Sequence, residues 1–263
     1  MNVQPPKACL AYASMLALFS LSGHAADHSP ATKGQHGAHV ATHWSYAGKG
    51  APNRWGDLES GFSLCKTGKQ QSPVDIRPED ADGKPAPLEF NYSRSTAEVI
   101  NNGHTIQVNL HQAGGFKLDG TEYKLLQFHF HTPSEEKIGG VAYPLVAHMV
   151  HKSAADKLAV VAVLFELGDE NKALKETFSL LPGNGKSAAI VGGFNPADLL
   201  PAYKGYFKFM GSLTTPPCTE DVQWQVLKQR VEISKAQLAA FRALYKMNAR
   251  PVQAINNRKI EAS

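Results

Sequence analysis

Seven runs of the chain are rich in apolar residues, several of them alternating with polar positions, and this pattern predicts β-strands. Gly, Pro, Asn and Asp separate each run from the next. Successive side chains of a strand point to opposite faces of the sheet, so each run can bury one face. The runs are residues 97–101, 105–110, 123–131, 143–151, 158–167, 206–210 and 222–227.

Two further segments have the spacing of helices. Residues 171–180 form one, and the other begins at Ser234, a favourable N-cap residue, and places Leu238, Phe241 and Leu244 on one apolar side. No internal repeat interrupts this order. The chain is therefore predicted to be mainly β (α+β), a single domain with a largely antiparallel sheet and short peripheral helices.

Composition agrees with one large globular domain. Of 263 residues, 43% are hydrophobic and 19% charged, and the formal net charge is +4. Beyond residue 25 the chain has 26 basic and 23 acidic residues, a net +3 spread along its length. This mild charge argues against a nucleic-acid partner, and no segment after the N-terminus is long and apolar enough to cross a membrane.

Residues 1–25 have the pattern of a cleaved secretory signal. Lys7 precedes an apolar run at 8–23, and small residues stand at Gly23 and Ala25. The prediction is a periplasmic or secreted protein, the alternative being a buried N-terminal helix. Cys9 lies in the apolar run without the surroundings of a lipid-attachment site.

Residues 26–42 are polar and small, which predicts a flexible N-terminal segment of the mature chain. The segment contains His28, His36 and His39. These histidines either collect metal or belong to a solvated tail, and the sequence leaves both readings open.

The candidate chemistry centres on three histidines. His129 and His131 share one face of a predicted strand, while Phe128 and Phe130 share the other. Turn residues between 132 and 143 return the chain as a second strand, which brings His148 beside the first pair, with His131 expected near His148. Three neutral imidazoles suit a catalytic zinc that keeps a fourth position for water. Alternating histidines can also be ordinary polar residues of a strand.

Cys65 and Cys218 are the two cysteines that remain after a signal is removed. In an oxidising compartment they are expected to form a disulfide, which would close a loop of more than 150 residues. Chain-entropy models put such a crosslink at roughly 5 kcal/mol. The alternative is a pair of buried free thiols.

Four blocks of residues, in this order, resemble those of the α-class carbonic anhydrases, and the resemblance is to the exported bacterial branch. It extends from His43 to Arg258. It implies that residues 43–263 form a catalytic domain built on a central ten-stranded, mostly antiparallel twisted sheet, with zinc at the base of a conical cleft. The blocks are Gln-Ser-Pro-Val-Asp-Ile at 71–76, Asn-Asn-Gly-His at 101–104, Gln-Phe-His-Phe-His at 127–131 and Gly-Ser-Leu-Thr-Thr-Pro-Pro at 211–217.

The resemblance implies reversible hydration of carbon dioxide to bicarbonate and a proton, the reaction of a zinc lyase. One zinc ion held by His129, His131 and His148 would lower the pKa of its water to about 7 and make a hydroxide available for attack. Thr214 would accept a hydrogen bond from that hydroxide and donate one to Glu135.

The resemblance also assigns the cleft around the zinc. His104 would carry the proton to buffer, since an imidazole with a pKa near 6.5 titrates at physiological pH. Sulfonamides and anions are the expected inhibitors, and the protein is expected to be a monomer or a homodimer. Thr215 would line the substrate side, Val150, Val160, Leu213 and Trp224 would form the apolar wall, and Asn101 and Gln127 would support the polar half of the cleft.

The chain departs from the family pattern at two positions. Two residues before the third histidine the family has Glu where this chain has Val146, and after the cleft glutamate it has His where this chain has Glu136. The hypothesis is that the carboxylate has moved, so that Glu136 reaches the ring of His148 and Val146 fills the vacated space. The alternative is simple loss of the histidine's partner.

Two other classes of protein share parts of the pattern. His129, His131 and Glu135 also fit the metal site of cupin barrels, which hold iron or manganese. Such a barrel would need a later glycine-rich segment with a lone histidine, and it would leave the block at 211–217 unexplained. A non-catalytic relative of the carbonic anhydrases is the other alternative, although such relatives typically lose a zinc histidine.

Overall fold

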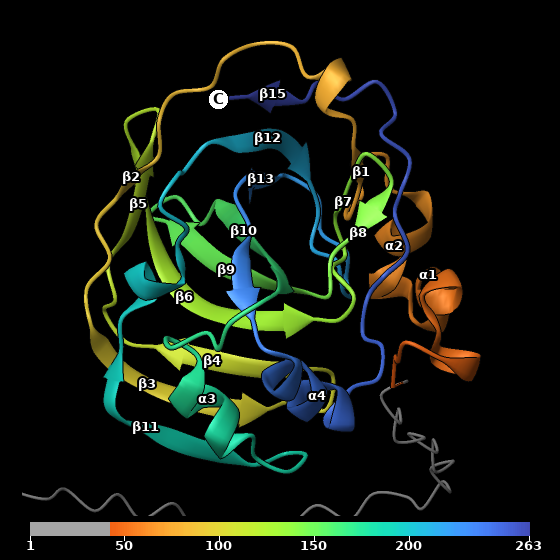
Figure 1. Ribbon diagram of the computed structural model, residues 1–263. Coiled ribbons are helices and arrows are strands. Elements are labelled where there is room, and N and C mark those ends of the chain that lie inside the picture. The colour runs from red at the N-terminus through yellow and green to blue at the C-terminus, as the bar shows by residue number, and fades with distance from the viewer. Residues whose placement is uncertain (1–42) are drawn as a thin grey trace, which may run out of the picture. The chain divides into compact units, whose positions relative to one another are not determined.

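A twelve-stranded twisted sheet organises the chain in the computed structural model, which describes residues 43–263 (Figure 1). The predicted signal at 1–25 and the histidine-containing segment at 26–42 lie outside the described residues. Among the described residues, no helix is long and apolar enough to span a membrane.

Neighbouring strands of the sheet follow the order β11-β3-β4-β6-β9-β10-β13-β12-β15, with β2, β5 and β14 attached at the sides. Most pairs are antiparallel, as predicted, but β10 pairs in parallel with both β13 and β14, so the sheet is mixed. The strands are β2 (Glu89–Phe90), β3 (Ser95–Asn101), β4 (Ile106–Leu110), β5 (Gly115–Leu118), β6 (Thr121–His131), β9 (Leu145–Ser153), β10 (Leu158–Leu167), β11 (Ser187–Phe194), β12 (Tyr206–Gly211), β13 (Val222–Leu227), β14 (Val231–Ile233) and β15 (Glu261–Ala262).

The count of twelve corrects the ten strands that the family resemblance implied. Strands β2, β14 and β15 are only two or three residues long. Two or three residues cannot show an alternation of hydrophobic and polar positions. Such a strand forms because the tertiary structure brings it beside another strand. A second, three-stranded sheet contains β1 (Asp75–Ile76), β7 (Lys137–Ile138) and β8 (Val141–Ala142).

All seven predicted strands are present. Those at 158–167 and 222–227 have the predicted ends, and the others differ by at most two residues at either end. The hydrophobic pattern did not predict β5 and β11. In β11 the adjacent Gly192 and Gly193 both have positive φ, and the pairing with β3 shifts register there. A glycine pair suggests a turn in a sequence, whereas here it forms an irregular end of an edge strand.

The helices are short and peripheral. They are α1 (Trp55–Leu58), α2 (Leu64–Thr67), α3 (Lys175–Leu180) and α4 (Lys235–Leu244), with 3-10 turns η1 (Gly48–Gly50), η2 (Pro52–Arg54), η3 (Ser60–Phe62), η4 (Pro78–Asp80) and η5 (Pro196–Leu199). The helix predicted at 171–180 begins only at Lys175, because the side chain of Asn171 accepts from the N–H of Leu174 and forms a turn there.

Helix α4 begins as predicted. Ser234 caps it, and Gln237 completes a capping box. Leu238 and Phe241 are buried, but Leu244 is 41% exposed, which corrects its assignment to the apolar side. At 3.6 residues per turn, Leu244 lies about 120° around the helix from Leu238 and so faces away from the sheet.

Strand β6 separates a core from the candidate site. On one face Phe130 contacts Phe178 of α3 and Phe241 of α4, so these helices cover that face. The other face carries His129 and His131. The alternation seen in the sequence thus places the histidines opposite the packed core.

Candidate metal centre and cleft

Three imidazoles meet at the middle of the sheet, on the face opposite α3 and α4. His129 lies opposite His148 across β6 and β9, and His131 lies opposite Val146. His131 was expected to lie near His148, so the observed register differs from the expected one by two residues. The three rings still converge, and one nitrogen from each lies within 4.8 Å of the others.

Each imidazole is held through the nitrogen that faces away from the centre. A ring so held keeps one orientation and offers its other nitrogen to a metal ion. The pairs are Nδ1 of His129 with Oε1 of Gln127 at 2.9 Å, Nδ1 of His131 with the carbonyl oxygen of Asn248 at 2.7 Å, and Nε2 of His148 with Oε2 of Glu136 at 3.0 Å.

The inward nitrogens have the character of metal ligands. Nε2 of His131 is buried and has no hydrogen-bond partner among the described residues. It lies 3.5 Å from Oε2 of Glu135, and Nδ1 of His148 lies 3.8 Å from the same oxygen. An orphaned buried nitrogen is costly unless something binds it, so the donor set fits a cation such as zinc.

The protonation of the histidines also bears on metal binding. Burial lowers the pKa of His129 to about 3 and lowers the pKa of His131 well below its usual range, with the neighbouring histidines adding to both shifts. Burial acts on His148 in the same direction, but the charge and hydrogen bond of Glu136 and the charge of Glu135 raise its pKa overall. Neutral imidazoles are the form that binds a metal ion.

Glu135 is a fully enclosed carboxyl group beside the histidines. One of its oxygens accepts the N–H of Arg250 at 2.7 Å, and the other, Oε2, has no hydrogen-bond partner among the described residues. Burial raises the pKa of Glu135 to about 7 and Glu136 adds to this, while His148, the N–H of Arg250 and the Thr214 hydroxyl oppose it. A bound divalent cation would lower that pKa and keep the group ionised.

A cavity of about 140 Å³ opens onto the histidines. Gln127 lies in its wall, as predicted for the polar half. Asn101 does not line the cavity; it is buried beside the loop that carries His104, where its side chain binds Pro182, Gly103 and Tyr245. The lining residues are Trp44, Tyr46, Asn102, His104, Thr105, Gln107, Gln127, His129, His131 and Thr215.

The residues expected to form the apolar wall lie together. Val150, Val160 and Trp224 belong to one buried cluster, and Leu213 packs against it. The ring of Trp224 meets His148 edge-to-face at 4.9 Å. These side chains therefore border the histidine centre on the side of β9, β10 and β13.

His104 is half-buried and lines the cavity. Its ring stacks on Trp44 with centroids 3.7 Å apart, and the ring of His43 meets it edge-on at 5.0 Å. Burial, and then the charge of His43, lowers the pKa of His104. The Asn102 side chain accepts the N–H of His104, which shapes the turn before β4.

The sequence pattern did not indicate Asn248, which contacts four residues in two segments of the site. Its carbonyl holds His131, its side-chain oxygen accepts the N–H of Thr132, and its amide donates to the carbonyls of Phe130 and His104. The residue is more than 100 positions from these partners in sequence, and no local pattern distinguishes it from other asparagines.

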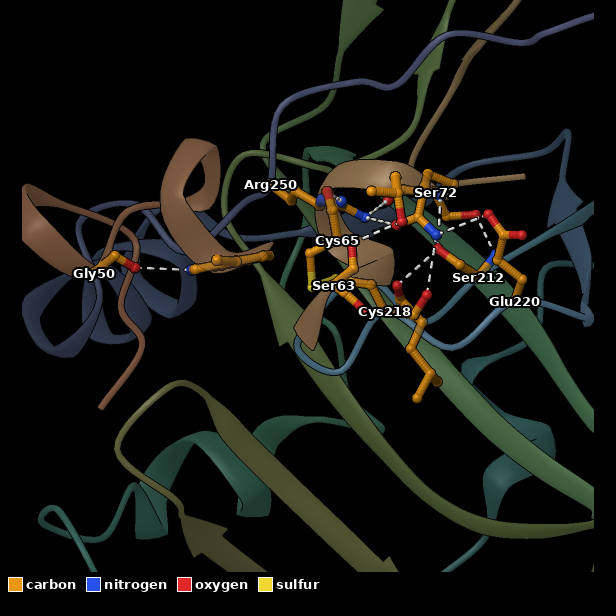
Figure 2. The surroundings of a disulfide bond; sticks show 12 residues. Gly50, Ser63, Cys65, Ser72, Ser212, Cys218, Glu220 and Arg250 are labelled. Atoms are coloured by element: carbon orange, nitrogen blue, oxygen red, sulfur yellow. Dashed lines mark hydrogen bonds between the residues drawn. A yellow bond between two sulfur atoms is a disulfide. The ribbon is translucent and has the colours of Figure 1, made fainter. Parts of the chain in front are cut away.

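The disulfide between Cys65 and Cys218 is present, as predicted (Figure 2). The N–H of Cys218 donates to the carbonyl of Thr215, so the bridge closes directly on the loop that carries Thr214 and Thr215. The guanidinium group of Arg250 donates to the carbonyl of Cys65 from the other side. The bridge and Arg250 together connect α2, the threonine loop and the segment that binds Glu135.

Comparison with known proteins gives the family. The model of the eukaryotic-type carbonic anhydrases matches residues 50–263. A carbonic anhydrase of Neisseria gonorrhoeae is 44% identical over 227 residues, 86% of this chain and 89% of that protein. The chain therefore belongs to the eukaryotic-type, or α-class, carbonic anhydrase family of enzymes.

Solved structures agree with this membership. An α-carbonic anhydrase from Thermovibrio ammonificans in complex with the inhibitor sulfanilamide is 41% identical, with a TM-score of 0.82 over 84% of this chain and 99% of that one. Dioscorin complexed with ascorbate is 31% identical, with a TM-score of 0.77 over 84% and 97% of the two chains.

Proposed function

We propose that this protein hydrates carbon dioxide reversibly to bicarbonate and a proton, using one zinc ion held by His129, His131 and His148. The observation that carries the proposal is the convergence of three imidazoles whose outer nitrogens are each bound and whose inner nitrogens face one point. Bound zinc would supply a hydroxide nucleophile at neutral pH by lowering the pKa of its water to about 7.

Thr214 and Glu135 would orient the nucleophile. The Thr214 hydroxyl has a single proton, and a neighbouring ionised Glu135 would take it as a hydrogen bond. The hydroxyl oxygen is then left to accept, which fixes the direction of the attacking lone pair. Carbon dioxide, a small uncharged molecule, would sit against Val150, Val160, Leu213 and Trp224, with Thr215 beside it.

The direct test is metal analysis of the purified mature protein together with a carbon dioxide hydration assay, with and without sulfanilamide. One zinc per chain, hydration activity and inhibition by the sulfonamide are the expected results. Iron or manganese with no hydration would overturn the assignment of zinc and of the reaction. Zinc with no hydration would favour a non-catalytic relative.

Replacing Thr214 with alanine is expected to lower kcat/KM on the order of 100-fold, the usual cost of losing one preorganised hydrogen-bonding group from an active site. Zinc content should not change, because Thr214 is not one of the ligands. Stopped-flow hydration at saturating buffer, with metal content measured on the same samples, makes the comparison. An unaltered kcat/KM would show that Thr214 has no orienting role.

His104 would export the proton that each turnover releases. It lines the same cavity as His129 and His131 and is half-buried, and its lowered pKa favours the neutral imidazole that accepts a proton at pH 7. Because the shift is downward, the rise of kcat with pH that depends on this group should be centred below 6.5.

Replacing His104 with alanine is expected to lower kcat in weak buffer on the order of 100-fold and to leave kcat/KM nearly unchanged, because only proton export is impaired. Added imidazole should restore part of the rate. Stopped-flow measurements over a range of buffer concentrations test this, and an unchanged kcat at low buffer would remove His104 from the proton path.

Export and inhibition complete the proposal. The signal-like residues 1–25 support a periplasmic or secreted location, to be tested by cell fractionation and N-terminal sequencing of the mature protein. Sulfonamides and anions are the expected inhibitors, in line with the sulfanilamide complex of the Thermovibrio ammonificans enzyme.

A further inference from the structure

The partner of the His148 ring comes from an unexpected place in the chain. Val146 shares a face of β9 with His148, two residues before it, and has no polar atom to offer. Its side chain is fully buried in the cluster that contains Val150, Val160 and Trp224. The atom within hydrogen-bond distance of Nε2 of His148 is Oε2 of Glu136, at 3.0 Å, in the connection between β6 and β7.

The backbone around Glu136 is held on both sides. The N–H of Ser134 donates to the carbonyl of Tyr143, and the N–H of Tyr143 donates to the hydroxyl of Ser134. That hydroxyl donates in turn to the carbonyl of Glu136 at 2.7 Å, and the next residue, Lys137, donates its N–H to Val74. Glu136 is 0% exposed, so it is a fixed interior group and not a surface carboxylate.

The His148 ring has little freedom between its neighbours. Trp224 packs edge-to-face against it at 4.9 Å, and Glu136 holds Nε2. Among the described residues, Oε1 of Glu136 has no hydrogen-bond partner, so this carboxyl group is bound through Oε2, to His148. A neutral imidazole has one N–H. When Nε2 of His148 donates that N–H to Glu136, Nδ1 is unprotonated and its lone pair faces the centre.

We propose that Glu136 is the positioning residue for the third metal ligand, and that the buried carboxylate needed there is supplied by the β6–β7 connection instead of by strand β9. The inference rests on the proposed zinc site and deepens it. A carboxylate that receives the outer N–H of a metal-bound histidine fixes its tautomer and raises its basicity, and losing it typically costs about 10–100-fold in metal affinity or activity.

The test is the rate at which zinc-loaded protein loses zinc to an excess of dipicolinate, which needs no turnover. Glu136→Leu is expected to release zinc about 10–100-fold faster than the parent. Glu136→Gln keeps a hydrogen-bond acceptor but loses the charge, so its rate of zinc release should lie between those of the parent and Glu136→Leu. Glu122→Gln removes an exposed carboxylate from β6 and should release zinc at the parent rate.

A reciprocal variant and a spectrum separate positioning from simple structural damage. Val146→Glu combined with Glu136→His returns a carboxylate to β9 beside two imidazole donors and should recover slow zinc release, whereas Val146→Glu alone should bring two buried carboxylates together and should not. Proton NMR of the zinc-loaded parent should show a downfield resonance from Nε2–H of His148 that is absent in Glu136→Leu.

The proposal fails if Glu136→Leu and Glu136→Gln both release zinc at the parent rate, or if the downfield resonance persists in Glu136→Leu. Inactivity of a zinc-loaded parent that releases zinc slowly would instead count against the proposed hydration reaction, because zinc release is measured without substrate.

Discussion

Replacing His131 with alanine is expected to remove both zinc and carbon dioxide hydration. The variant loses one of three ligands, and the two that remain cannot enclose a zinc ion. It also leaves the carbonyl of Asn248 and the inner oxygen of Glu135 facing an empty space in a fully buried position. His129→Ala should have the same effect, because it also removes one of the three ligands. The side chain of Gln127, which holds the His129 ring, would then lose its partner.

The measurement is zinc content after dialysis against a chelator, followed by stopped-flow hydration, which should fall to the uncatalysed rate. His111→Ala is the matched control, since that histidine is exposed and lies outside the residues lining the cleft. It should keep one zinc and the parent rate. Full activity in a zinc-free preparation of the parent would overturn the assignment of the metal.

Replacing both cysteines with serine is expected to lower the free energy of unfolding by roughly 5 kcal/mol, an upper figure from the entropy of closing a long loop. The bridge joins residues 153 positions apart, so the unfolded chain gains much freedom when it is removed. Denaturant unfolding of the parent and of Cys65→Ser/Cys218→Ser measures the difference.

The same variant should lose activity even where it remains folded. Thr214 and Thr215 stand just before Cys218, and the N–H of Cys218 donates to Thr215. Without the bridge, the loop loses its covalent link to Cys65 of α2, although Gln71 still donates to the carbonyl of Cys218. Hydration should therefore fall in native conditions, while zinc content stays near one per chain.

Thiol labelling checks that the bridge forms in the protein recovered from its proposed periplasmic or secreted location. If residues 1–25 are removed as proposed, the denatured and unreduced protein should contain no reactive thiol. Two labelled thiols would show that Cys65 and Cys218 remain free, and the stability difference above should then vanish.

Local sequence pattern determined much of the secondary structure and the direction in which two of the metal-site histidines point. Alternation along residues 123–131 put His129 and His131 on one face and Phe128 and Phe130 on the other, because strand periodicity depends on backbone geometry alone. Ser234 began a helix for an equally local reason, since its side chain binds the N–H of Gln237. Because Cys9 lies in the predicted signal, Cys65 and Cys218 were left as the one expected pair.

The sequence even indicated the contact of Glu136 with His148, because Glu136 follows the first of two paired strands and His148 lies in the second. The separation is 12 residues, so the turn between them restricts where each can go. What the pattern did not settle was the register, in which His148 lies opposite His129. A slip of two residues keeps every side chain on its face, so alternation cannot distinguish the two pairings.

Tertiary structure alone decided the remaining parts of the site. Asn248 and Arg250 hold His131 and Glu135 from the far end of the chain, and their identities carry no local sign of these contacts. The parallel pairing of β10 with β13 and β14, and the exposure of Leu244, likewise follow from how whole elements pack. Contacts between distant segments depend on the summed packing of many residues. The alternation of side chains along a strand and the capping of a helix depend on a few neighbouring residues.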